Sequence, residues 1–196
     1  YDLNRETYNG ELTLSRFPLD RFLTVDSLGS ASANFRLEGR YFSWPQAKTS
    51  VNAGIRQLFY KEHEYKDITL QATLDKTHLR GTMVSKDPDA PLDLVFRGDS
   101  LQQQYQVGLG GYIGKVDLQA LHLMQEPLTM GLKVDLQGFI GEHSAYALKA
   151  RFDSLSMADS RKTYTLGSLD IDMASDLKKT TLDVTVSYTH LTLPTT

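Results

Sequence analysis

The sequence predicts an all-β protein built as one curved repeat β-sheet, and three observations lead to this prediction. Apolar and polar residues alternate with a period of two along most of the chain, as at Ala31, Ala33, Phe35 and Leu37. Glycine, proline and charged turn segments separate these runs at short spacing. No connection carries a long 3.6-residue pattern, so the helices that join parallel strands are not expected.

Composition and charge narrow the possible functions. The chain has 196 residues, of which 40% are hydrophobic and 23% charged, as in an ordinary folded protein. Its net charge of -3 comes from interleaved acidic and basic residues, so nucleic acid is not an expected partner. The absence of cysteine excludes disulfides and thiolate ligands. No apolar run approaches the roughly 18 residues of a membrane-spanning helix, and Tyr1 begins no signal-peptide pattern.

A leucine-rich segment occurs twice. Leu12–Leu23 (LTLSRFPLDRFL) and Leu121–Leu132 (LHLMQEPLTMGL) share the spacing L-x-L-x-x-x-P-L-x-x-x-L. An alternating segment that ends in glycine follows each, Phe35–Gly39 and Val134–Gly138. We therefore expect residues 1–185 to be a fragment of a repeat β-sheet groove, with two imperfect repeats at about 12–120 and 121–185.

The first half of the sequence predicts the following strands and turns, given in chain order. Leu12 and Leu14 alternate with polar residues, and Pro18 then predicts one short helical turn. Further strands are expected around Phe35 and around Ala53, with an aromatic turn at Tyr41–Gln46 between them.

A charged turn is expected at Lys61–Lys66, followed by the clearest hairpin, Ile68–Leu74 and Leu79–Met83 around a polar turn. Lys86–Pro91 is a turn by composition, and Leu92–Phe96 is the next strand.

The second half predicts further strands, which bring the total to about a dozen. These strands are Tyr105–Leu109, Val116–Ala120, Met130–Leu136, Tyr146–Phe152, Leu169–Met173 and Leu182–Val184. The last residues, Val186–Thr196 (VSYTHLTLPTT), resemble a translated sequencing adaptor, so we treat residues 186–196 as an artefact. With no start methionine, we expect the natural chain to be cut at both ends.

No catalytic residue, metal site or cofactor is expected. His63, His78, His122 and His143 lack the i, i+4 spacing of metal ligands, and solvated or turn positions are expected for them. The run Gly108–Gly114 (GLGGYIG) lacks the phosphate-loop spacing and a following helix, which favours a strand bend.

Other chemically active residue types also favour structural roles. The carboxylates Asp67, Asp75, Asp87, Asp89 and Asp93 are expected in turns or in solvent. Ser100, Ser154 and Ser160 lack a G-x-S-x-G context, and Trp44 beside Pro45 is expected to pack in a turn.

The two leucine segments, the glycine-closed strand SLGSASANFRLEGR and the hairpin YKDITLQATLDKTHLRGTMVS resemble TamB-type proteins of the AsmA-like family. The resemblance covers most of residues 12–185. It implies a U-shaped β-sheet trough (a β-taco) in the periplasm of a Gram-negative envelope, tethered to the inner membrane by an anchor outside this fragment. It also implies phospholipid transport to the outer membrane and a role in outer-membrane protein assembly, with an assembly barrel as a possible partner.

Under this resemblance the apolar sides of the strands would bind phospholipid acyl chains, at roughly 0.8 kcal/mol per buried methylene. The expected groove lining is Ile68, Leu70, Leu74, Leu92, Leu94, Phe96, Leu132, Val134, Leu136, Leu148, Leu169 and Ile171. Two alternatives remain: a closed β-sandwich that binds a glycan or protein ligand, and an envelope hydrolase built on β-sheets.

Overall fold

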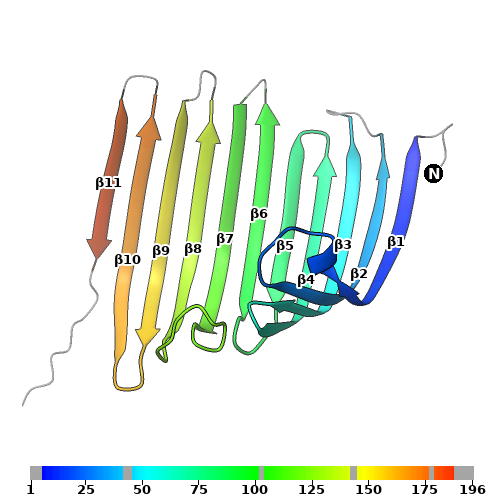
Figure 1. Ribbon diagram of the computed structural model, residues 1–196. Coiled ribbons are helices and arrows are strands. Elements are labelled where there is room, and N and C mark those ends of the chain that lie inside the picture. Colours follow the sequence, from blue (N-terminus) through cyan, green and yellow to red (C-terminus); the bar gives the residue numbers. More distant parts are fainter. Residues whose placement is uncertain (1–5, 42–45, 102–103, 142–144, 177–178, 188–196) are drawn as a thin grey trace, which may run out of the picture.

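The computed structural model describes residues 6–41, 46–101, 104–141, 145–176 and 179–187. These residues form one antiparallel sheet of eleven strands, in which each strand lies beside its neighbour in sequence. Figure 1 shows them side by side from β1 (blue) to β11 (brown). The strands are β1 (Thr7–Pro18), β2 (Leu28–Arg40), β3 (Lys48–Tyr60), β4 (His63–Asp75), β5 (His78–Ser85), β6 (Leu92–Leu101), β7 (Gln104–Asp117), β8 (Thr129–Ile140), β9 (Tyr146–Ala158), β10 (Thr163–Ser175) and β11 (Thr180–Ser187).

The prediction of an all-β chain with one helical turn near Pro18 is confirmed. A 3-10 turn, η1 (Leu19–Arg21), directly follows Pro18, and the rings of Phe17 and Phe22 stack around it at 4.8 Å. Val186 and Ser187 extend β11, where they pair with β10, and residues 188–196 lie outside the described part. None of the described helical segments has the length and hydropathy needed to cross a bilayer.

The β3–β4 connection is shorter than the sequence suggested. Lys61 and Glu62 have φ values of 48° and 64°, which suits the two-residue hairpin turn that matches the twist of a sheet. His63 to Lys66 therefore belong to β4, and the expectation of a longer charged turn there was wrong.

The second leucine segment also differs from the prediction. β7 ends at Asp117, whose carboxylate Oδ1 accepts the backbone N–H groups of Gln119 and Ala120, each at 3.0 Å. These bonds turn the chain, so the strand expected through Ala120 stops early, and Leu121 to Leu128 lie in the β7–β8 connection. Because Leu12 and Leu14 lie in a strand, the two leucine segments are not equivalent structures. The unit that recurs is the antiparallel strand.

One end of the sheet contains a band of irregular positions. Strand register shifts between Leu14 and Phe17 in β1 and between Ile113 and Val116 in β7. Positive φ values at Arg16 (47°), Asp67 (50°) and Ser154 (54°) fall in the same band. Because β-bulges bend a strand and increase its twist, this end bends, and in Figure 1 the lower ends of the first strands turn forward. We refer to it as the bulged end.

The described residues form a single layer. Apart from a contact between β2 and η1, the substantial contacts between elements all join adjacent strands. The described strands thus form one sheet instead of two, and the closed β-sandwich alternative does not fit them.

Candidate functional site: an apolar sheet face

One face of the sheet is apolar from its first strand to its last. Directly opposite residues on antiparallel strands share a face, so the register defines rows of side chains that cross the whole sheet. The central row contains Leu12, Phe35, Ala53, Leu70, Met83, Leu94, Gly111, Val134, Phe152, Leu169 and Val186, one from each strand.

Rows on either side continue this surface. The second row contains Gly10, Leu37, Val51, Ala72, Gly81, Phe96, Leu109, Leu136, Ala150, Ile171 and Val184. A third contains Thr49 on β3 and then Leu74, Leu79, Val107, Leu148, Met173 and Leu182 with glycines between them. A fourth, nearest the bulged end, runs from β1 to β8 and contains Leu14, Ala33, Ile55, Ile68, Ser85, Leu92, Ile113 and Leu132. We call these four rows the apolar face.

The structure places every residue of the predicted groove lining on the apolar face. Leu70 and Leu94 lie in its central row, Phe96 and Leu136 in the second, and Ile68 in the fourth. Their binding of acyl chains stays a prediction, but their common orientation is a property of the fold.

The apolar face is larger than an ordinary surface patch. Ten strand spacings of about 4.8 Å make it about 48 Å wide, and four rows about 6.8 Å apart make it about 20 Å high. Its projected area is about 1,000 Å², whereas the largest apolar patch of a typical monomer covers about 300 to 600 Å². A surface of this size in water favours a partner or a ligand.

Side chains on the apolar face are covered mainly by their neighbours in the same sheet. Val134 in the central row is 4% exposed, but Leu37 is 40% and Val107 51% exposed. Among the described residues no second sheet packs on the face, so residues such as Leu37 and Val107 are accessible, whereas Ala33, Ile68 and Leu132 in the fourth row are only 1%, 7% and 8% exposed.

The opposite, polar face has a mixed charge. Ion pairs cross the strands, including Arg36 with Glu11 at 3.5 Å, and Lys149 with Asp172 at 3.2 Å. Several hollows, including one of about 470 Å³ beside Arg80, Arg97 and Lys149, lie mainly over this polar face. Exposed ion pairs contribute roughly 0 to 1 kcal/mol each to stability. The polar face therefore contributes more to the hydration of the sheet than to its folding stability.

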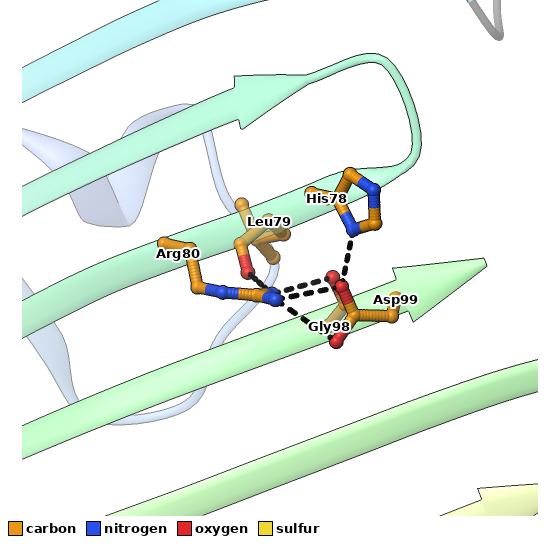
Figure 2. Close-up of polar contacts among 5 residues, drawn as sticks. All are labelled: His78, Leu79, Arg80, Gly98 and Asp99. Atoms are coloured by element: carbon orange, nitrogen blue, oxygen red, sulfur yellow. Dashed lines mark hydrogen bonds and ion pairs between the residues drawn. The ribbon is translucent and has the colours of Figure 1, made fainter.

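A polar cluster joins β5 to β6 on the polar face (Figure 2). The guanidinium of Arg80 donates hydrogen bonds to both carboxylate oxygens of Asp99, at 2.8 and 3.1 Å, and the ring of His78 lies 2.5 Å from the same carboxylate. The pKa of Asp99 lies below its ordinary value, mainly because of the hydrogen bonds from Arg80 and to a smaller extent because of the hydrogen bond from His78. His78 is exposed, as the sequence predicted.

His63 contradicts the expectation of a solvated histidine. Its side chain is 10% exposed, because β4 carries it against the connections 86–91 and 118–128 at the bulged end. Its Nδ1 lies 3.2 Å from the carbonyl oxygen of Ala120, and its Nε2 lies 3.5 Å from Oδ2 of Asp87. Asp87 lies in the connection 86–91, which was predicted as a turn, but it is 1% exposed and not solvated. Neither burial was foreseen, because both depend on connections that are distant in sequence.

The remaining candidate residues take structural positions. Gly108–Gly114 lies in β7 and packs against neighbouring strands. Asp75 pairs with Lys48 at 3.1 Å, and Asp67 and Ser154 lie at the bulges. His122 is exposed, and Trp44 and His143 lie outside the described residues.

Comparison of the chain with protein-family models, curated proteins and solved structures gives no match.

Proposed function

We propose that this chain is a segment of a non-enzymatic, lipid-conducting bridge of the TamB type. The single observation that carries the proposal is the continuous apolar face, whose central row has a hydrophobic residue or glycine on every strand from β1 to β10. The ligand proposed for this face is the acyl chain of a phospholipid.

The energetics suit binding combined with movement. Removing a methylene group from water contributes about 0.8 kcal/mol, so a sixteen-carbon chain gains about 12 kcal/mol if fully buried and about half of that against a one-sided surface. Because these contacts are not directional, adjacent positions along the central row offer similar energies. A lipid can therefore move between strands without crossing a polar barrier on the face.

Both edges of the sheet support the proposal that it is part of a longer structure. Within the described residues β1 and β11 each pair on one side only. An unpaired strand edge is able to accept a further strand, as a longer repeat sheet requires. In this proposal the whole protein lies in the periplasm, is tethered to the inner membrane by another segment, and supports phospholipid transport and protein assembly at the outer membrane.

Photo-crosslinking tests the ligand and the face together. A photoreactive benzoylphenylalanine replaces Leu136 on the apolar face in one variant, and Gln137, the next residue of β8, on the polar face in the other. Each purified chain is irradiated with vesicles of phosphatidylethanolamine and phosphatidylglycerol, and lipid adducts are counted by mass spectrometry. If the side chain at position 136 contacts two or more methylenes of a bound lipid, the contact contributes about 1.6 kcal/mol or more. The adduct yield at position 136 should then be at least about tenfold higher than at position 137.

Equal adduct yields at positions 136 and 137 in folded samples would contradict the proposal, because a lipid held by the apolar face cannot reach both sides of one strand. Circular dichroism provides the control that both chains keep the β-sheet.

A further inference from the structure

The strongest unexplained chemistry in the described residues lies at His63. Its Nε2 is buried and has no hydrogen-bond partner. Buried polar atoms in folded proteins are almost always paired, so one that is not requires an explanation. The atom directed toward it is Oδ2 of Asp87, at 3.5 Å.

The partner of Nδ1 determines which atom of the ring is able to bind a ligand. A carbonyl oxygen only accepts hydrogen bonds, so Nδ1 must carry the proton that it shares with Ala120, at 3.2 Å. A neutral ring then presents a lone pair at Nε2, which faces a carboxylate oxygen. Two acceptors in this arrangement repel each other unless a proton or a metal cation lies between them.

Asp87 is held in place by two backbone hydrogen bonds. Its Oδ2 accepts the backbone N–H of Lys66 at 2.8 Å, and its Oδ1 accepts that of Asp89 at 2.9 Å. Each carboxylate oxygen keeps a second lone pair available. The Asp89 carbonyl oxygen in turn accepts the N–H of Asp117 at 2.9 Å, so both connections at this end are fixed around the cluster.

A third ligand is available from Asp89. One potential ligand atom from each of His63, Asp87 and Asp89 lies within 4.8 Å of the others. For a tetrahedral ion with bonds of about 2.0 to 2.2 Å, the ligand atoms are about 3.4 Å apart. The 3.5 Å between Nε2 of His63 and Oδ2 of Asp87 matches this spacing, and the carboxylate of Asp89, which is half-buried, lies within 4.8 Å of both.

We propose that His63, Asp87 and Asp89 form a zinc site that fastens the bulged end of the sheet. The ligands are Nε2 of His63 and one carboxylate oxygen from each aspartate, with water in the fourth position on the half-exposed side of Asp89. An imidazole in the ligand set favours a transition metal over magnesium or calcium. The bond from Nδ1 to Ala120 is the type of outer contact that orients metal-binding histidines.

The site connects three parts of the chain. His63 belongs to β4, both aspartates belong to the connection 86–91, and Ala120 belongs to the connection 118–128. The ion would therefore stabilise these connections relative to the sheet at the end where the strands bend.

Zinc titration of the full chain tests the proposal. Isothermal titration with zinc chloride, after removal of metals by a chelator, should give one bound ion per chain, and NMR should show the shift at the ring of His63 alone among the five histidines. The thermal midpoint should rise by about 5 to 10 °C at a free zinc concentration a hundred times the Kd.

Two variants make the test specific. Asp89→Asn keeps the size of the side chain and should weaken zinc binding by at least about tenfold, since even outer-shell changes at metal sites cost about that much. Asp99→Asn is the matched control, because His78 and Asp99 also form a His–Asp contact but have no third ligand beside them. This substitution should leave zinc binding unchanged.

Absence of zinc uptake by the folded chain overturns the proposal. Equal binding by the wild type and Asp89→Asn also overturns it, as does weaker binding caused only by Asp99→Asn. Circular dichroism of each variant confirms that a loss of binding is not a loss of the sheet.

Discussion

At the scale of single residues, Gly111 allows β6 and β7 to lie close together. Its φ is 146°, a region that side chains disfavour, and a Cβ at this position would overlap the carbonyl oxygen of Asp93 on β6. The obstructing atom belongs to the backbone, so a rotamer change cannot relieve the overlap. Gly111 also lies in the central row of the apolar face, opposite Leu94.

Gly111→Ala should therefore destabilise the chain by about 1 to 3 kcal/mol, through backbone strain and the displaced strand. Urea denaturation followed by circular dichroism measures the change. Gly110→Ala is the matched control, because a Cβ there meets only an ordinary contact of 3.7 Å with the oxygen of Val134. A stability of Gly111→Ala equal to that of Gly110→Ala would show that the strands adjust freely at this position.

At the scale of elements, the β5–β6 pair combines a polar cluster with two apolar strand faces. Asp99 receives hydrogen bonds from Arg80 and lies beside His78, all on the polar face, while Met83 and Leu94 pair on the apolar face. The cluster stabilises the end of the β5–β6 strand pair that is farthest from the bulged end. Its contribution depends on the charge of Asp99, and therefore on pH.

Asp99→Asn should reduce the free energy of unfolding by about 0.5 to 1 kcal/mol near neutral pH. In the folded chain, hydrogen bonds from Arg80 and His78 hold the pKa of Asp99 below its ordinary value of 3.8. The stabilisation that the charged carboxylate provides is therefore fully present above the unfolded pKa. It is lost as pH falls through the lower, folded pKa. Denaturation curves from about pH 7 to about pH 2 should show the difference between wild type and variant disappear at the acidic end.

Asp93→Asn provides the control on the same strand and the same face. Asp93 is exposed and forms no ion pair within the described residues, so its substitution should change stability little at any pH. A wild-type advantage over Asp99→Asn that persisted at the acidic end would mean that packing, and not charge, explains the effect of the change at Asp99.

At the scale of the whole molecule, a single layer with one apolar face has a predictable behaviour in water. The face has a projected area of about 1,000 Å², and burial of apolar surface contributes about 25 cal/mol per Å². Two copies in contact through this face would remove much of it from water. The isolated chain is thus expected to associate with itself unless an amphiphile covers the face.

Size-exclusion chromatography with light scattering should show oligomers of the purified chain that convert to monomers when a mild detergent is added. Leu94→Glu, on the apolar face, should weaken this association, because it places a charge in the contact. Val95→Glu is the control, since Val95 is also apolar and is 55% exposed but lies on the polar face of the same strand. Equal effects of the two substitutions would exclude the apolar face as the associating surface.

The sequence by itself determined the all-β class, most of the strands and the residues of the apolar face. Alternation is a local property: in a strand, consecutive side chains point to opposite faces, so the pattern around Leu70 or Leu136 requires no knowledge of its neighbours. The helical turn at Pro18 was predictable for the same reason, because proline acts on the backbone at its own position.

Only the tertiary structure decided how these strands are arranged and where the buried polar groups lie. Alternating strands suit two packed sheets as well as one, and the register that aligns eleven of them in a single layer is set by pairing across the whole chain. The leucine spacing at 121–132 was misleading, because the carboxylate of Asp117 turns the chain before those residues. His63 and Asp87 are 24 positions apart (87 − 63 = 24) and meet only after folding. Their contact is tertiary, so no local pattern could have predicted it.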